Sequence, residues 1–169
     1  MLPTLDRDIE LVTMPREGNS WAAARLGADA GLLEGSALPG EGLSIIAGHN
    51  TLNDTDYGPF ALLSTLEVND TVIVRDENGA LKFFRVYANE LLEPDDMERL
   101  SALAGEDALV LLTCENESAS GGYLNRRVVF ARENKKMQGR SQIPEERGGE
   151  APVPHLIGRS PHLTGQVYR

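Results

Sequence analysis

The sequence is poor in cysteine and has no long apolar run. Cys114 is the only cysteine among 169 residues, which excludes an intramolecular disulfide and a zinc site built from several thiolates. No stretch approaches the roughly 18 apolar residues of a membrane-spanning helix, and residues 1–16 lack the apolar core of a signal peptide. These absences predict either a soluble protein or a domain separated from its membrane anchor.

Positive charge is also scarce. The chain has 16 Lys and Arg against 26 Asp and Glu, a formal net charge of −10, and no cluster of basic residues is evident along it. Because nucleic-acid binding needs such a cluster, the sequence predicts no nucleic-acid partner. The length and the 41% hydrophobic content predict one folded domain. We place this domain at residues 1–132, and we predict that the Pro- and Gly-rich residues 133–169 form a C-terminal tail or arm with little structure of its own.

Apolar patterning predicts a mainly β protein with short connecting helices. The clearest strand is the aliphatic run at residues 108–114, which ends at Cys114 and has the pattern of a strand buried on both faces. Asn78-Gly79 between two β-rich segments predicts a hairpin of residues 70–75 and 81–87. Further strands are expected at residues 9–13, 43–47 and 126–131, short helices within 20–33, 58–66 and after Pro94, and a flexible loop at 115–125.

Reactive side chains stand at the ends of three of these strands: His49, Cys114 and the pair Arg126 and Arg127. A thiolate attacks carbonyl carbon well, an imidazole can move protons, and a guanidinium can stabilise a developing oxyanion, so the set suits acyl transfer. A free cysteine is also among the residues most often buried. The residues therefore leave open a second hypothesis, a non-catalytic β-barrel binding module with Cys114 in its core.

Three segments of the chain resemble the sortase family. Residues 33–50 are similar to the segment that leads into the family's catalytic histidine, residues 111–114 resemble its Thr-Leu-x-Thr-Cys signature, and residues 125–131 resemble its arginine-bearing last strand. The order His, Cys, Arg is also the family's, and the resemblance covers about residues 9–132. Val110 stands where the signature has its first Thr, a change between two β-branched residues.

The resemblance implies a closed β-barrel of about eight strands and a cysteine transpeptidase that needs no cofactor. Such an enzyme cleaves a C-terminal sorting signal of the Leu-Pro-x-Thr-Gly type in a surface protein and forms a thioacyl intermediate. It then transfers the acyl group to an amino group of a peptidoglycan precursor or of a pilin lysine. The family implies a position on the extracellular face of the membrane, with an anchor absent from this sequence. A cysteine peptidase that delivers the acyl group to water is the enzymatic alternative.

The resemblance assigns catalysis to His49, Cys114 and Arg126. Aligning the small and basic residues after the last strand with Ala131 and Arg132 selects Arg126, and strand alternation points Arg127 to the opposite face. Thr113 and Arg127 are predicted to contact the substrate. Four acidic residues precede residue 100: Glu93, Asp95, Asp96 and Glu98. They resemble a calcium site of some sortases, but capping of a helix explains them equally well, and we predict no metal there.

Overall fold

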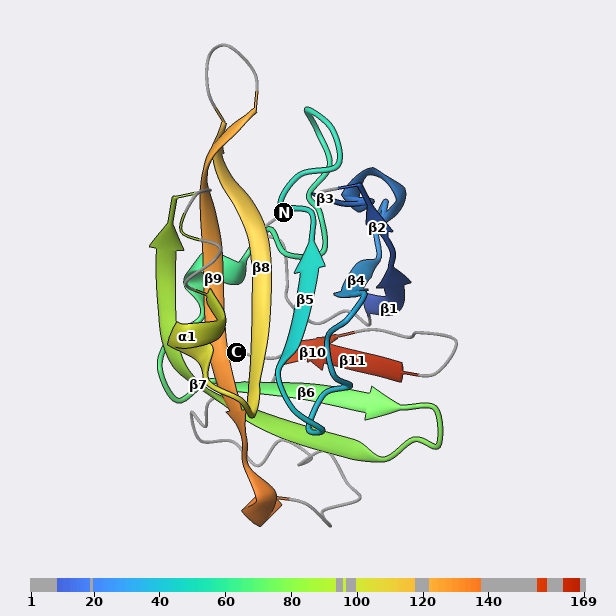
Figure 1. Ribbon diagram of the computed structural model, residues 1–169, viewed down its shortest axis with the longest axis vertical. Helices are drawn as coiled ribbons and strands as arrows, with labels where there is room; N and C mark the ends of the chain where they lie inside the picture. Colours follow the sequence, from blue (N-terminus) through green and yellow to red (C-terminus); the bar gives the residue numbers. More distant parts are fainter. Residues whose placement is uncertain are drawn as a thin grey trace, which may run out of the picture.

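A computed structural model describes residues 9–18, 20–93, 96, 100–117, 122–137, 155–157 and 163–167. The described part is mainly β with a few short helices (Figure 1), which confirms the predicted fold class. The strands are β1 (Ile9–Met14), β2 (Arg16–Glu17), β3 (Ser20–Trp21), β4 (Ala30–Leu33), β5 (Ser44–Gly48), β6 (Thr71–Asp76), β7 (Leu81–Leu92), β8 (Ala108–Glu117), β9 (Tyr123–Glu133), β10 (His155–Ile157) and β11 (Leu163–Val167). The helices are α1 (Leu100–Ala104) and the 3₁₀ turns η1 (Ala23–Arg25), η2 (Leu63–Thr65) and η4 (Lys135–Met137).

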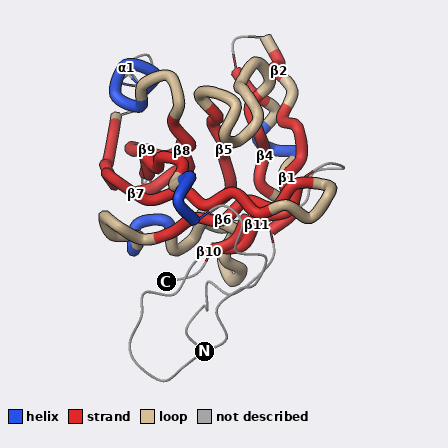
Figure 2. Tube along the Cα trace, turned by 90° about the horizontal axis from the view of Figure 1, so that it is seen from below, coloured by secondary structure: helices blue, strands red, loops and turns tan. Residues whose placement is uncertain are grey.

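Seven strands form one curled sheet in the order β6, β7, β9, β8, β5, β4, β1. Figure 2 shows how the sheet bends around its interior. Most neighbours are antiparallel, but β5 runs parallel to β8 and β1 runs parallel to β4. The parallel pair β5 and β8 matters for function, because both strands then end toward the same side of the molecule (Figure 1).

Strand β8 is buried on both faces, as its aliphatic run predicts. Leu109 and Leu111 belong to the main core inside the curl, whereas Ala108 and Val110 pack in a second cluster with Leu100 of α1. The helix therefore covers the outer face of the sheet where β7, β9 and β8 meet. A strand enclosed in this way is a rigid support for the residues that follow its aliphatic run.

The predicted hairpin is present as β6 and β7. Five residue pairs join the strands in antiparallel register, from Thr71 with Arg85 to Arg75 with Leu81. The turn depends on Gly79, whose φ of +82° is costly for residues with a side chain, and on the Asp76 carboxylate, which accepts backbone hydrogen bonds from Asn78 and Ala80. The local turn signal was sufficient here because all of these contacts lie within five residues.

The short helix expected within residues 20–33 is present as the 3₁₀ turn η1, but the strand that follows it was not predicted. This strand, β4, lies between β1 and β5. Four residues are too few to show a strand period, and partners on both sides provide the hydrogen bonds that the local sequence does not signal. Gly31 also has a packing role, since a Cβ there would lie 2.6 Å from Cδ2 of Leu26.

The expected flexible loop at residues 115–125 is much shorter than predicted. Strand β8 continues to Glu117 and β9 begins at Tyr123, and these two residues pair with each other. Cross-strand pairing outweighs the polar composition of the segment, which had indicated a loop. Cys114 therefore lies inside β8, three residues before its end, and not at the strand terminus.

Two short segments of the predicted C-terminal tail are strands. Backbone ladders join β10 to β6 and β11 to both β6 and β1. The existing sheet supplies the partners for these segments, so their lack of apolar periodicity did not reveal them. The division of the chain at residue 132 stays a prediction.

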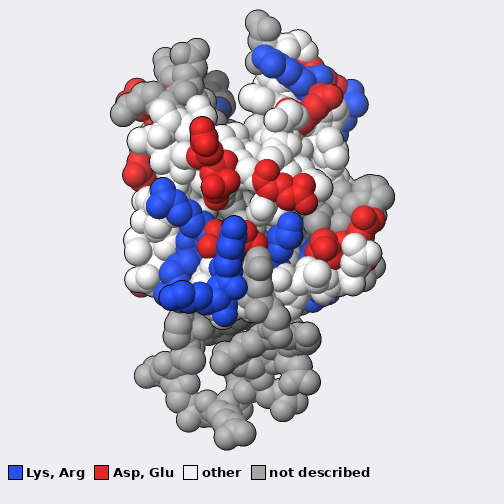
Figure 3. Space-filling view, turned by 60° about the horizontal axis from the view of Figure 1, so that its bottom comes forward, with Lys and Arg blue, Asp and Glu red and all other residues white. Residues whose placement is uncertain are grey.

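Basic side chains do gather on the folded protein, although the sequence shows no cluster. Arg85 and Arg132 face each other across β7 and β9 and are exposed, and η4 adds Lys135 and Lys136 directly after β9. Figure 3 shows Lys and Arg side chains collected on this face with acidic side chains beside them. The sheet brings together residues that are about 50 positions apart in the chain. The absence of a nucleic-acid partner stays a prediction.

Tyr87 joins the sheet to α1, and its ionisation is expected to lower the stability of the fold at alkaline pH. Its hydroxyl donates a 2.9 Å hydrogen bond to the Ala104 carbonyl. Burial raises the pKa of Tyr87, and the Arg132 guanidinium, 4.5 Å from the ring centroid, opposes part of the rise. A raised pKa in the folded state means that the folded protein holds this proton more tightly than the unfolded chain. The stabilisation is complete below a pH of about 10 and is lost as the pH rises through the folded pKa.

We therefore expect Tyr87→Phe to lower the free energy of unfolding by about 1 kcal/mol near neutral pH. The difference between the variant and the wild type should shrink above a pH of about 10, where the phenol of the unfolded chain ionises. Urea unfolding at a series of pH values measures this difference. A constant difference across the whole series would contradict a hydrogen bond that depends on the phenolic proton.

Candidate active site

The site lies where β5 ends and β8 continues. The last backbone pair between these parallel strands joins Ala47 to Leu112. Extending the register by two residues places His49, directly after β5, level with Cys114. Beyond this point β8 keeps β9 as a neighbour, with Cys114 opposite Arg126, but none of the described strands pairs with its other side. Cys114 is accordingly half-buried, which contradicts the alternative in which it is a buried core residue.

Two side-chain hydrogen bonds hold β8 to the last residue of β5 and to the chain just after it. The buried Thr113 hydroxyl donates to the Gly48 carbonyl at 2.7 Å, and the Asn50 amide donates to the Cys114 carbonyl at 3.2 Å. These bonds connect residues 65 and 64 positions apart and replace the missing backbone ladder. They fix the position of His49 along the sheet relative to the thiol.

The His49 backbone is fixed by a loop that precedes η2. Its carbonyl accepts a 3.0 Å hydrogen bond from the Phe60 amide, and Gly58 donates to the Asn50 carbonyl at 2.7 Å. A Cβ on Gly58 would lie 2.1 Å from the His49 carbonyl oxygen, so only glycine allows the two backbones to approach so closely. The imidazole is half-buried, and its Nε2 lies 3.0 Å from the Ala23 carbonyl oxygen in η1.

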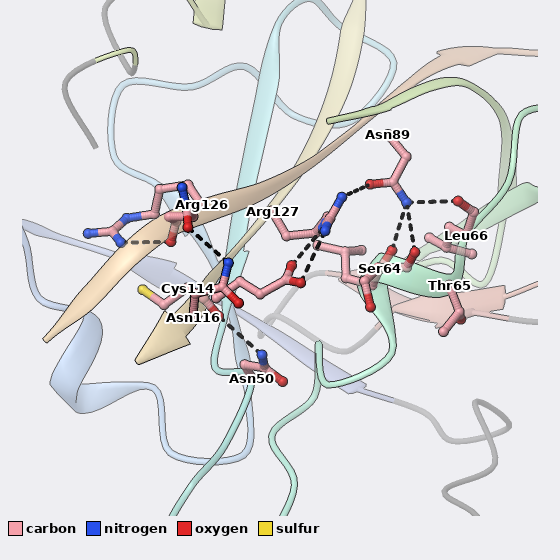
Figure 4. A network of polar contacts seen from close by, with 12 residues as sticks. Asn50, Ser64, Thr65, Leu66, Asn89, Cys114, Asn116, Arg126 and Arg127 are labelled. Atoms are coloured by element: carbon pink, nitrogen blue, oxygen red, sulfur yellow. Dashed lines mark hydrogen bonds and ion pairs between the residues drawn. The ribbon is translucent and has the colours of Figure 1, made fainter. Parts of the chain in front are cut away.

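Cys114 and Arg126 point to the same side of the β8 and β9 hairpin (Figure 4). Strand alternation places both on the outer face of the sheet, the face that carries Val110 and Val128. The Arg126 guanidinium donates to the carbonyls of Asn125 at 3.0 Å and Tyr123 at 3.5 Å. The guanidinium is thus held by carbonyls of its own strand, without a carboxylate partner among the described residues.

Arg127 lies on the opposite face and belongs to a different network. Its guanidinium forms two hydrogen bonds with Glu115, at 2.6 and 3.0 Å, and a longer one with the Asn89 side chain. The Asn89 amide in turn donates to carbonyls of the η2 segment, including Leu66 at 2.7 Å (Figure 4). The side chains of Arg127 and Thr113 therefore have internal partners, and their predicted contact with substrate stays a prediction.

The sequence did not single out several residues that shape this site. Asn50, Asn89 and Glu115 are polar residues in polar surroundings, and Ala23 acts through its backbone carbonyl. Asn50 ends the segment that resembles the histidine segment of sortases, but the other three residues lie in none of the three matched segments. The only available signal was that Asn50 directly follows His49.

The predictions on metal binding and on a membrane anchor concern the whole chain, and the structure addresses them only in part. Asp95 and Glu98 of the acidic segment lie outside the described residues. In the described ranges, no group of three or more His, Cys, Asp or Glu side chains could hold a metal ion. Within the same ranges, no helix has the length and apolar character to cross a membrane.

The fold is that of solved sortases. Sortase A from Corynebacterium diphtheriae, in a lid-mutant form, has a TM-score of 0.54 and 23% identity, and the match covers 72% of this chain and 61% of that one. Sortase C-1 from Actinomyces oris has a TM-score of 0.54 and 20% identity, covering 68% and 63%. Sortase C1 from Streptococcus agalactiae has a TM-score of 0.52 and 24% identity, covering 78% and 60%. This chain thus spans less than two thirds of each of these proteins.

The curled β-sheet carries a half-buried cysteine on β8, with Arg126 as its partner on β9 and His49 level with it directly after β5. A sequence profile of the sortase domain matches residues 2–134. The chain belongs to the sortase family, whose members are cysteine transpeptidases that act at the cell surface. A comparison with curated protein sequences finds no match.

Proposed function

We propose that this protein is a transpeptidase in which Cys114 is the nucleophile, His49 the general acid and base, and Arg126 the group that stabilises the oxyanion. The observation that carries the proposal is the direct pairing of Cys114 with Arg126 on the outer face of the sheet, at the level where β5 gives way to His49. The arrangement offers a nucleophile, a proton carrier and a fixed positive charge on three adjacent strand segments.

The proposed reaction has two acyl transfers. His49 takes the proton of the Cys114 thiol, the sulfur bonds to the carbonyl carbon of the scissile amide, the carbon–nitrogen bond breaks, and His49 gives that proton to the departing amine. A thioester remains on Cys114. An incoming amine then attacks this thioester and gives a proton to His49, the carbon–sulfur bond breaks, and His49 returns the proton to the Cys114 sulfur. Arg126 stabilises the negative oxygen in both tetrahedral intermediates, and a guanidinium suits this role because it stays charged.

We infer that the substrate is a C-terminal sorting signal of the Leu-Pro-x-Thr-Gly type, cleaved after Thr. The acceptor is an amino group of a peptidoglycan precursor or of a pilin lysine, at the extracellular face of the membrane. Membership of the sortase family supports this inference. We further infer that the sheet closes into a barrel of about eight strands, an inference supported by the ladders that join β11 to β1 and to β6.

Mass spectrometry of the intact protein with a mixed library of sorting-signal peptides tests the proposal. We expect a covalent adduct on Cys114 whose mass equals the peptide segment up to Thr, and its transfer to an added amine such as triglycine. The ratio of transfer to hydrolysis separates a transpeptidase from a cysteine peptidase. A protein that forms no adduct with any member of the library would exclude both.

A further inference from the structure

The His49 imidazole is held by a backbone carbonyl of a distant turn. Nε2 of His49 lies 3.0 Å from the carbonyl oxygen of Ala23, which precedes it by 26 residues. A carbonyl oxygen can only accept a hydrogen bond, so Nε2 must carry the proton of this bond. In the neutral ring, Nδ1 is then the unprotonated nitrogen and holds the basic lone pair.

We propose that the Ala23 carbonyl is a positioning group that fixes His49 in the Nε2–H tautomer, so that Nδ1 is the nitrogen that exchanges protons during acyl transfer. This proposal rests on the proposed function of His49 as general acid and base. Within the described part of the chain, Nδ1 has no hydrogen-bond partner, and the parallel register of β5 and β8 puts His49 level with Cys114.

The bond to Ala23 can persist through both halves of the reaction. When Nδ1 takes a proton from the thiol or from the incoming amine, the ring becomes an imidazolium that still donates from Nε2. When Nδ1 gives the proton to the departing amine, the ring returns to the Nε2–H tautomer. The imidazole therefore does not have to turn or exchange its partner between the two steps, and a charged ring strengthens the bond to the carbonyl.

The turn that carries this carbonyl is itself anchored to the sheet. The Ala23 oxygen also accepts a 3.1 Å hydrogen bond from the Leu26 amide, and the Ala22 amide donates to the Pro15 carbonyl at 3.0 Å. Leu26 is 4% exposed and packs with Met14 in a cluster on the sheet. Gly31 has no side chain, which leaves room for the methyl groups of Leu26.

The position of the carbonyl thus follows from core packing and from main-chain bonds. Because the His49 carbonyl is held separately by the Phe60 amide, the orientation of the ring is the main freedom that remains at this residue. The contact with η1 removes this freedom, which is the expected role of a positioning group.

The tautomer can be read directly from ¹⁵N NMR of the wild-type protein labelled at histidine. The spectrum of His49→Gln identifies the signals of His49 among the three histidines. In the neutral ring we expect the attached proton on Nε2 and the strongly downfield shift of an unprotonated nitrogen on Nδ1. A proton on Nδ1, or the averaged shifts of a free imidazole, would overturn the proposal.

A backbone substitution tests whether the carbonyl sets the tautomer. Replacing Ala24 by lactic acid converts the Ala23 carbonyl from an amide to an ester, which is a weaker acceptor, and it changes no side-chain atom. We expect the Nε2–H tautomer to lose population toward the free-imidazole mixture, and kcat for transfer to fall by a factor of about 3 to 10 with KM unchanged. An unchanged tautomer in this variant would show that the carbonyl does not control it.

The matched control replaces Leu26 by its α-hydroxy analogue. This change removes the Leu26 amide that bonds to the Ala23 oxygen but leaves the Ala23 carbonyl an amide. We expect the control to keep the Nε2–H tautomer of His49. If it shifts the tautomer as strongly as the first variant, the effect comes from a loosened turn, and the positioning role of the carbonyl is rejected.

The NMR experiment and the adduct experiment test the tautomer of His49 and the proposed function independently of each other. A wild-type protein that forms no thioacyl adduct refutes the proposed function, whatever the tautomer of His49. A protein that forms the adduct while neutral His49 carries its proton on Nδ1 refutes only the assignment of the two ring nitrogens.

Discussion

Replacing Cys114 by alanine is expected to lower the rate of transpeptidation by a factor of about 10⁴ or more and to abolish the covalent adduct. The reason is that no other thiol exists in the chain, and the loss of a nucleophile removes a whole catalytic unit and not one contact. Rates of transfer from a sorting-signal peptide to an amine, compared with wild type under the same conditions, measure the effect.

The fold itself should tolerate this change. Cys114 is half-buried, and it is its backbone carbonyl that accepts the hydrogen bond from the Asn50 side chain. We expect Cys114→Ala to change the free energy of unfolding by less than about 1 kcal/mol. Cys114→Ser is the matched control for size and polarity. A stable alanine variant that still transfers peptides at more than a few per cent of the wild-type rate would contradict the assignment of the nucleophile.

Replacing each of the two adjacent arginines by alanine is expected to affect a different property: catalysis for Arg126 and stability for Arg127. Arg126→Ala should lower kcat by a factor of about 10² to 10³, the usual cost of removing an oxyanion donor, with little change in stability. Arg127→Ala should lower activity far less, but it leaves the Glu115 carboxylate without its ion-pair partner. The side chains of Arg127 and Glu115 are 18% and 23% exposed. We therefore expect a stability loss of about 1 to 2 kcal/mol, between the values for exposed and buried ion pairs.

Parallel kinetics and urea unfolding of the two variants provide the test. The double variant Arg127→Met with Glu115→Gln is a useful control, because removing both charges should recover part of the stability lost in Arg127→Ala. If Arg127→Ala abolishes transfer while Arg126→Ala remains active, the roles of the two residues are reversed. The printed sequence alone could not separate them so sharply, since both follow Asn125 in the same strand.

Much of the architecture was predictable because it depends on near neighbours. The β6 and β7 hairpin follows from a turn signal between two apolar segments, and the buried strand β8 follows from its aliphatic run. The order of His49, Cys114 and Arg126, with the phrases around them, led to the sortase family, which the profile match confirms. Their assignment as catalytic residues stays a prediction.

Other features required the folded chain. Strand β4 was missed because its four residues gain their hydrogen bonds from β1 and β5. The predicted loop at residues 115–125 proved mostly strand, because the two arms of the hairpin pair with each other despite their polar composition. The strands β10 and β11 depend in the same way on partners supplied by the sheet.

The sequence by itself determined the mainly β class, the family and the identity of the groups that can react, because these are carried by local patterns and short phrases. Only the tertiary structure decided which groups meet. It gave Arg127 a carboxylate partner on the inner face, set Arg126 opposite the thiol, and placed the Ala23 carbonyl against the His49 ring. Such contacts join segments from 12 to 65 residues apart, and no local pattern encodes a hydrogen bond whose geometry depends on how the whole sheet curls.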